Sequence, residues 1–202
     1  MKPERPMLIM IGGPPWVGKT TCARGVFASL ENSAWLDGDD VWRVNPFSVE
    51  DPRLRNSDRN MSFVLRTYLE SRFDYVVFSS VVLTDKPITD GILNAIDLGD
   101  YDILFFMLSC SRSAIEARSA TRDNVADPES RFARAAKGQD AIFIDTTDMT
   151  PGEVAQTIID LVRNPSEAGL APVWRGGIRE WKREKTHNNC VQPMRASRAA
   201  DA

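Results

Sequence analysis

Gly13-Pro14-Pro15-Trp16-Val17-Gly18-Lys19-Thr20 is the stretch of this chain that decides its fold. Two glycines five residues apart, followed by a lysine and a hydroxyl residue, have the spacing of a phosphate-binding P-loop. Glycine lets the backbone turn tightly and approach a phosphate closely. Successive N–H groups at the start of a helix then form a nest that favours an anion. The pattern predicts a nucleoside triphosphate site made by this stretch together with Thr21.

The residues around this loop provide the context that the motif requires. Met7–Ile11 is a continuous apolar run typical of a buried strand, and Lys19–Leu30 has the pattern of a helix. Lys19 is placed to reach the β- and γ-phosphate oxygens, and the Thr20 hydroxyl to ligate Mg²⁺. A chance match to the pattern would lack this strand–loop–helix setting.

Composition limits the classes of protein to which the chain can belong. It has 202 residues, 43% of them hydrophobic, and a formal net charge of −3, which favours one domain and argues against a general affinity for nucleic acid. The cysteines, Cys22, Cys110 and Cys190, have no metal or disulfide spacing, and no apolar run approaches the ~20 residues of a membrane span. The first residues also lack an apolar signal region. We therefore expect a cytoplasmic protein, a monomer or homodimer, with neither a membrane nor a nucleic acid as partner.

Apolar runs alternate with helical patterns along the chain. The expected strands are Met7–Ile11, Ser33–Leu36, Tyr75–Phe78 (with a possible extension to Leu83), Ile103–Leu108 and Ala141–Ile144. The expected helices are Lys19–Leu30, Asp58–Arg72, Thr89–Ile96, Arg112–Ser119 and Pro151–Val162, the last capped by Asp148 or Thr150. This alternation predicts an α/β three-layer sandwich, a parallel sheet with helices on both faces.

The end of the chain differs from the rest. We expect a domain over residues 1–163 and a C-terminal extension over 164–202 that is partly helical and then mobile. Trp174 and Trp181 are seven residues apart and would share one face of a helix that packs back on the domain. A segment that binds a partner or covers the substrate is the alternative.

Three carboxylates follow the second expected strand, in Asp37-Gly38-Asp39-Asp40. The carboxyl ends of parallel strands point toward the ligand site of such a sheet. A carboxylate there can accept the proton of an attacking hydroxyl or help to hold Mg²⁺. The alternative is turn chemistry, with Asp39 or Asp40 capping the next helix.

The P-loop, the Asp-Gly-Asp-Asp and an arginine-bearing segment after the fourth strand together resemble the small P-loop kinases of the nucleoside monophosphate kinase superfamily. Between Met7 and Val162 the chain is most similar to the group of gluconate kinase, shikimate kinase and chloramphenicol phosphotransferase. The resemblance implies a sheet order of 2-3-1-4-5. It also implies transfer of the γ-phosphate of ATP, with Mg²⁺, to a small-molecule acceptor.

The same resemblance implies roles for the carboxylates beside Lys19. In the shikimate kinase pattern, the first aspartate, here Asp37, helps to hold Mg²⁺ through water, and the second, here Asp39, meets the substrate hydroxyl. The chloramphenicol phosphotransferase pattern aligns its base nearer Asp40. The base therefore remains open among these three residues.

Arginines after the fourth strand are the expected lid, over about residues 112–134. Arg118 and Arg122 are four residues apart, on one face of a helix, where they would neutralise charge on the transferred phosphoryl group, and Arg118 also contacts the nucleotide. Arg131 and Arg134 are further candidates. A solvated charged helix is the alternative. By the resemblance, Asp145 or Thr146 lies in the loop that passes beside the adenine.

The chain departs from the common pattern at its third strand, which ends in Ser79-Ser80 where many P-loop enzymes carry an aspartate for the Mg²⁺ shell. The metal assignment therefore depends on Thr20 and Asp37. This departure leaves a non-catalytic ATP-binding regulatory or assembly module as a hypothesis beside the kinase.

The acceptor is expected between the aspartates and residues 45–66. Arg59 is the candidate for gripping an anionic acceptor, because a guanidinium can bond a carboxylate or phosphate through two N–H groups. Trp42, Phe47 and Phe63 would make part of the pocket apolar. A sugar acid, an antibiotic or a similar metabolite fits this description, and a nucleotide or nucleoside kinase is the alternative within the same class.

Overall fold

Five parallel strands form the centre of the molecule, in the computed structural model that describes residues 2–119, 141–164 and 174–175. Their order across the sheet is β2-β3-β1-β4-β5. The α/β class and this strand order confirm the expectations from the sequence. The strands are β1 (Met7–Gly12), β2 (Ser33–Asp37), β3 (Tyr75–Ser79), β4 (Asp102–Ser109) and β5 (Ile142–Asp145).

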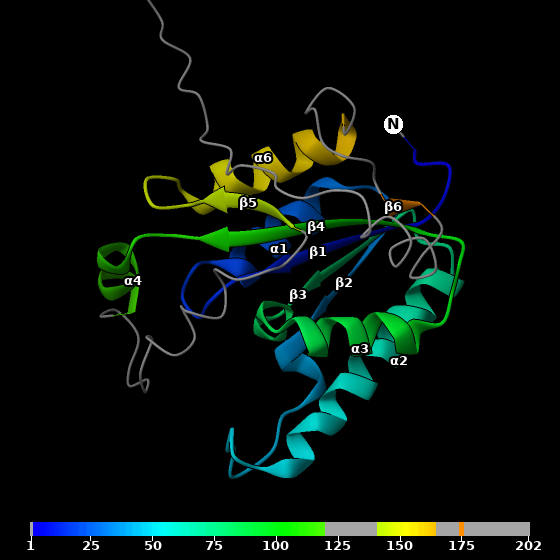
Figure 1. The fold of residues 1–202 in the computed structure, drawn as a ribbon. Helices are drawn as coiled ribbons and strands as arrows, with labels where there is room; N and C mark the ends of the chain where they lie inside the picture. Colours follow the sequence, from blue (N-terminus) through cyan, green and yellow to red (C-terminus); the bar gives the residue numbers. More distant parts are fainter. Residues whose placement is uncertain (1, 120–140, 165–173, 176–202) are drawn as a thin grey trace, which may run out of the picture.

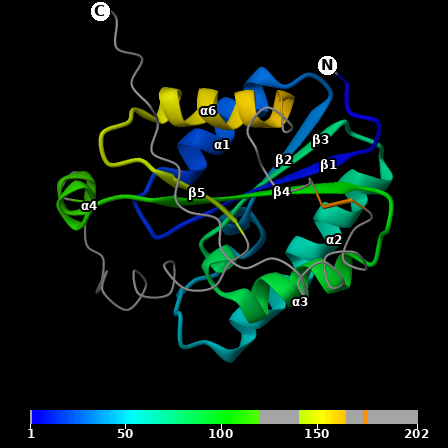
Figure 2. The same cartoon turned by 45° about the horizontal axis from the view of Figure 1, so that its top comes forward.

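Helices cover both faces of this sheet (Figures 1 and 2), with α1 and α6 on one face and α2 and α3 on the other. A further helix, α4, follows the carboxyl end of β4, and three short 3-10 helices, η1 to η3, follow β2 and β3. The helices are α1 (Lys19–Ser29), η1 (Gly38–Val41), η2 (Pro52–Arg55), α2 (Asn56–Glu70), η3 (Val81–Thr84), α3 (Lys86–Ile96), α4 (Arg112–Ser119) and α6 (Pro151–Arg163).

The continuous apolar character of the strands reflects burial on both faces of the sheet. In β1, Ile9 and Ile11 belong to the core cluster that includes α1 and α6. Leu8 and Met10 belong to the cluster that includes α2 and α3. Because side chains alternate along a strand, each residue of β1 serves one of the two cores.

Side-chain caps set the ends of two elements that the sequence left open. The Ser80 hydroxyl accepts a hydrogen bond from the Val82 N–H, which starts η3, so β3 ends at Ser79 and does not extend to Leu83. Thr150 caps α6 and forms a capping box with Glu153, as one of the two predicted caps.

Residues Trp174–Arg175 form a short strand, β6, antiparallel to β4. The placement of Trp174 on a helix face is therefore wrong. The β5 strand pairs only with the carboxyl-terminal half of β4, so the backbone of Asp102 and Ile103 is open to another strand. Trp181 lies outside the described residues.

Candidate active site

The P-loop joins the carboxyl end of β1 to the start of α1, as the motif predicts. Gly13 and Gly18 have φ angles of 147° and 101°, in the region that favours glycine. A Cβ on Gly13 would lie 2.6 Å from the carbonyl oxygen of Leu108, so the first glycine is also required by close packing on β4. Trp16, at φ 60°, is half-buried in the same loop.

The start of α1 suits an anion. The helix has no capping side chain and no acidic residue in its first turn, and its N-terminal N–H groups remain available for phosphate oxygens. The Lys19 ammonium donates a hydrogen bond of 2.8 Å to the carbonyl oxygen of Pro14, so it lies over the loop. Thr20 and Thr21 are exposed beside it. These residues fit a triphosphate with its magnesium ion.

The ends of β2 and β3 bring Asp37 and Ser79 together, because these two residues are paired in the sheet register. The Ser79 hydroxyl donates to Asp37 Oδ2 at 3.0 Å, and Trp35 Nε1 donates to the Ser79 oxygen at 3.1 Å. Asp37 Oδ1 accepts the backbone N–H of Asp39 at 3.1 Å. Both Asp37 oxygens are therefore engaged in a residue that is only 8% exposed. Asp37, and not Asp39 or Asp40, caps the 3-10 helix η1 that follows β2.

Asp39 and Asp40 have different surroundings, although they are neighbours in η1. Both are exposed, and Asp40 forms an ion pair with Arg43. The pKa of Asp39 is raised, first because the surrounding protein withdraws its carboxyl group from water and second because Asp37 adds negative charge. The positive charge of Lys19 acts in the opposite direction and lowers the same pKa.

Arg118 connects α4 with the P-loop and with the loop after β5. Its guanidinium donates to the carbonyl oxygen of Thr146 at 2.7 Å, to Thr146 Oγ1 at 3.2 Å and to the carbonyl oxygen of Val17 at 3.5 Å. Thr146 is buried, whereas the neighbouring Asp145 is exposed. Arg118 thus lies where the nucleotide base is expected. The other lid candidates, Arg122, Arg131 and Arg134, lie outside the described residues.

The segment from Trp42 to Phe63, which we call the acceptor arm, leaves the sheet after η1 and returns in the first half of α2. Asn60 Nδ2 donates to the carbonyl oxygen of Val41 at 3.1 Å and so ties α2 to η1. Arg59, the expected anion-gripping residue, is exposed in the first turns of α2. In the part of the chain that the structure describes, Trp42 Nε1 is buried and has no hydrogen-bond partner.

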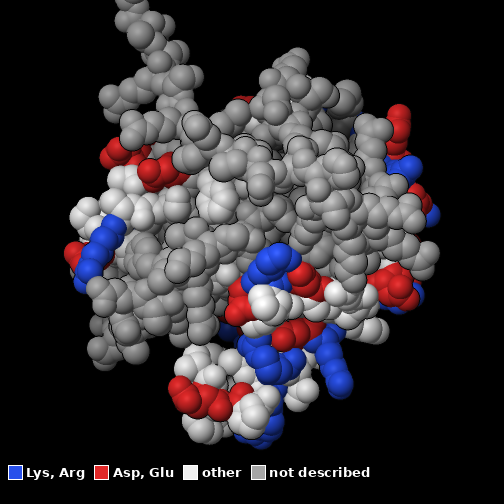
Figure 3. Space-filling view, in the orientation of Figure 1, with Lys and Arg blue, Asp and Glu red and all other residues white. Residues whose placement is uncertain are grey.

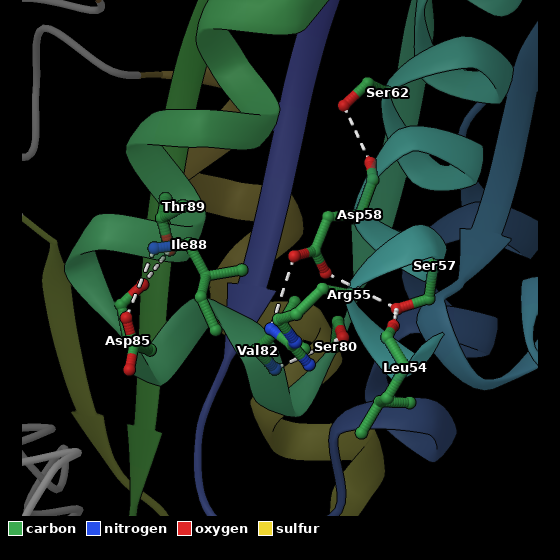
Figure 4. A network of polar contacts seen from close by, with 10 residues as sticks. All are labelled: Leu54, Arg55, Ser57, Asp58, Ser62, Ser80, Val82, Asp85, Ile88 and Thr89. Carbon is green, nitrogen blue, oxygen red and sulfur yellow. Dashed lines mark hydrogen bonds and ion pairs between the residues drawn. The ribbon is translucent and has the colours of Figure 1, made fainter. Parts of the chain in front are cut away.

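A polar network joins the end of the arm to η3 and α3 (Figure 4). Asp58 forms an ion pair with Arg55 at 3.2 Å, and Asp85 caps α3 by accepting the Ile88 N–H. Burial raises the pKa of Asp58, and the negative charge of Asp85 raises it further. The network adds two carboxylates, Asp58 and Asp85, and one cation, Arg55, to this side of the site.

Within residues 2–119, 141–164 and 174–175, no three His, Cys, Asp or Glu side chains form a group that could hold a metal ion. A magnesium ion bound with a nucleotide does not need such a group, because phosphate oxygens and waters supply most of its ligands. No described helix combines the length and the apolar composition that crossing a bilayer requires.

Two parts of this site were missed from the sequence. The hydrogen bonds from Trp35 to Ser79 and from Ser79 to Asp37 depend on the pairing of β2 with β3. The expected strand order implies that these two strands are neighbours, but it does not by itself give their register. The contact of Arg118 with Thr146 joins residues 28 positions apart, and no spacing pattern marks it.

Comparison with solved structures defines the class of fold, which is that of the P-loop kinases. The resemblance suggested by the sequence is confirmed at the level of the fold. No protein-family model matches the chain, and no curated protein sequence matches it significantly.

Three solved structures illustrate this similarity. The tunicamycin resistance protein of Deinococcus radiodurans is 19% identical, with a TM-score of 0.62, over 78% of this chain and 96% of that one. A gluconokinase from Sinorhizobium meliloti is 15% identical, with a TM-score of 0.58, over 82% and 97% of the two chains. The APS kinase of Mycobacterium tuberculosis, solved with AMPPNP and APS, is 17% identical, with a TM-score of 0.55, over 80% and 99%.

Proposed function

We propose that this chain is an ATP-dependent kinase that transfers the γ-phosphate to a hydroxyl group of a small acceptor, such as a sugar acid, an antibiotic or a similar metabolite. The observation that carries the proposal is the placement of Lys19 over the P-loop after β1 and of Asp37 to Asp40 after β2, at the same edge of the parallel sheet. It brings a phosphate-binding cation and a carboxylate to one edge of the sheet, as phosphoryl transfer to a hydroxyl requires.

The nucleotide is held by the P-loop in this proposal. The N–H groups of residues 13–20 and the Lys19 ammonium bind the phosphates, and Arg118 binds beside the base and supports the charge that develops during transfer. A magnesium ion bound with the nucleotide would neutralise part of the phosphate charge. Thr20 would offer it a hydroxyl ligand, and Asp37 would help to hold it through water.

Asp39 is the base that the geometry favours among the three aspartates. Asp37 already accepts two hydrogen bonds, and Asp40 is paired with Arg43. In the proposed step, the acceptor oxygen bonds to the γ-phosphorus, the bond from that phosphorus to the β,γ-bridging oxygen breaks, and the hydroxyl proton passes to Asp39. ADP and the phosphorylated acceptor are the products.

The test is a screen of hydroxylated metabolites, nucleosides, nucleotides and antibiotics for acceptor-dependent ADP release, with each product identified by mass spectrometry. Lys19→Ala is expected to abolish transfer. Asp39→Asn is expected to lower kcat at least about a hundredfold, because a positioned base contributes roughly that much. Asp40→Asn is the matched control, and we expect it to change kcat far less.

Tight ATP binding without any phosphorylated product across this screen would overturn the proposal. It would favour a non-catalytic ATP-binding module, the hypothesis that the serine at the end of β3 motivates. Transfer to a nucleotide or nucleoside would keep the reaction and identify the acceptor.

A further inference from the structure

The large apolar side chains that are exposed among the described residues all lie in the acceptor arm. They are Val44, Phe47, Val49 and Phe63, with exposed fractions of 38%, 60%, 55% and 71%. The other large apolar residues of 2–119 and 141–164 are buried or partly buried. Exposed apolar groups scattered singly need no explanation, but their concentration in one segment marks an interaction site.

This segment lies next to the proposed base. It follows η1, which contains Asp39, and the Asn60–Val41 hydrogen bond brings α2 back to the end of η1. Phe63 follows Asn60 by three residues, so the two side chains are neighbours on the helix surface. Ser62, one position earlier, donates to the carbonyl oxygen of Ile92 and faces α3. Phe63 is therefore turned away from the core and toward the side of the helix that meets η1.

The charges of the same segment do not favour an anion. Residues 37–66 contain six carboxylates and five arginines. Four of these arginines form ion pairs with nearby carboxylates, in the pairs Arg43–Asp40, Arg53–Asp51, Arg55–Asp58 and Arg66–Glu70.

Each of these exposed pairs is weak by itself, but together they leave no concentration of positive charge. Figure 3 shows blue and red side chains side by side over the lower part of the molecule, where Figure 1 places α2 and the arm. Asp85 adds another carboxylate close to Asp58. Among the five arginines of residues 37–66, Arg59 is the one for which the described structure shows no ion pair with a carboxylate.

We propose that the acceptor is an uncharged, hydroxylated small molecule with an apolar portion. Its reacting hydroxyl lies at Asp39, and its apolar portion lies on Phe47, Val49 and Phe63. This inference rests on the proposed kinase function and narrows it, because it disfavours the sugar acids and other anionic acceptors that the fold also accommodates.

The test uses three related glucosides with the full-length protein. Octyl β-D-glucoside carries an apolar chain, octyl β-D-glucosiduronic acid adds a carboxylate, and methyl β-D-glucoside lacks the chain. Binding of each is measured by calorimetry below its micelle-forming concentration, and transfer from ATP is measured in parallel. We expect octyl glucoside to bind at least about tenfold more tightly than methyl glucoside, because one exposed aromatic side chain covered by an alkyl chain is worth that much. We also expect it to bind more tightly than the glucosiduronic acid, whose carboxylate would meet the aspartates of the site.

Two variants of neighbouring surface positions separate the apolar contact from charge recognition. Phe63→Ser is expected to lower the affinity for octyl glucoside about tenfold while the affinity for methyl glucoside and ATP stays unchanged. Arg59→Gln is expected to leave octyl glucoside binding unchanged. Tighter binding of the glucosiduronic acid, lost in Arg59→Gln, would overturn the inference, and so would binding of none of the three compounds.

The outcomes also distinguish this inference from the proposed function. Transfer to a carboxylate-bearing acceptor, without binding of the alkyl glucosides, would overturn the inference and leave the kinase standing. Octyl glucoside binding that depends on Phe63, in a protein that transfers phosphate to nothing, would support the apolar site and overturn the kinase.

Discussion

The Ser79 hydroxyl donates a hydrogen bond of 3.0 Å to Asp37 Oδ2 and so joins the ends of β3 and β2 beside the P-loop. Ser79 stands where many P-loop enzymes have a carboxylate, and here it orients the carboxylate of the neighbouring strand. Trp35 completes the link by donating to Ser79, and its ring lies 6.1 Å from that of Phe27 in α1. The P-loop helix and the aspartate are thus connected through two side chains.

Replacement of Ser79 by alanine tests whether this link positions Asp37. Ser79→Ala removes the donor to Asp37 and leaves the Trp35 N–H without its acceptor, at a residue that is 1% exposed. We expect a loss of about 1–3 kcal/mol in the free energy of unfolding in urea, the usual cost of an unsatisfied buried group. We also expect kcat to fall about tenfold with little change in KM for ATP, because one buried hydrogen bond is worth about that much.

Ser80→Ala is the matched control for this prediction. Ser80 is also buried, but its hydroxyl accepts from Val82 and does not touch Asp37. It should lower stability without the tenfold change in kcat. Equal kcat values for the two variants would show that Ser79 has no special role in positioning Asp37.

The sequence predicted the fold well because its signals are local. Each strand is a short apolar run, and the P-loop occupies eight consecutive residues, so strand order and the edge that carries the site follow from motif and resemblance. The pairing of Asp37 with Ser79 depends on register between strands 42 positions apart. Which of three consecutive carboxylates faces Lys19 likewise depends on backbone turns that composition does not encode.

The side chain of Ser80 leaves no room for a side chain at position 38, and this close packing gives a second prediction. A Cβ at Gly38 would lie 2.3 Å from Ser80 Oγ and 2.7 Å from Ser80 Cβ. Gly38→Ala should therefore destabilise the protein by about 1–3 kcal/mol, as overpacking in a core does, and displace the turn that carries Asp39. Urea unfolding and kcat measure the two effects.

A double mutant identifies the cause of this destabilisation. Combining Gly38→Ala with Ser80→Gly removes the clashing atoms, so the two changes should couple favourably by more than about 1 kcal/mol in a mutant cycle. Additive effects would mean that the glycine is needed for another reason.

Arg118 provides a third prediction, on nucleotide affinity. Its hydrogen bonds to Thr146 and Val17 place the guanidinium between the P-loop and the loop after β5. Arg118→Ala should weaken ATP binding about tenfold, the loss typical of a charged hydrogen-bond donor, as measured by calorimetry. Arg112→Ala, at the exposed start of the same helix, is the control and should leave the affinity unchanged. An unchanged affinity in Arg118→Ala would remove this residue from the nucleotide site.

The acceptor side was the least predictable part of the site. Arg59 stays a predicted anion-binding residue, but sequence alone does not show that Arg43, Arg53, Arg55 and Arg66 pair with carboxylates. Phe47 and Phe63 were expected to line a pocket, and the structure shows that they remain exposed. Tertiary arrangement, not residue type, determines the character of this surface.

Two aspartates of the acceptor arm, Asp51 and Asp58, should give opposite pH dependences of stability. The pKa of Asp58 is raised by burial and by Asp85, so its protonated form is favoured by folding. That contribution to stability is present below the pKa of the unfolded state and is lost as the pH rises through the pKa of the folded state.

The pKa of Asp51 is lowered by its hydrogen bonds with Arg53, so its contribution to stability is present at neutral pH and is lost as the pH falls. Compared with the wild type, Asp58→Asn should therefore gain in free energy of unfolding as the pH rises above about 4. Asp51→Asn should be less stable than the wild type at neutral pH, and this deficit should shrink as the pH falls below about 4. Urea unfolding of the three proteins at several pH values measures both slopes. A negative slope for Asp58→Asn would show that its ion pair with Arg55 outweighs its burial.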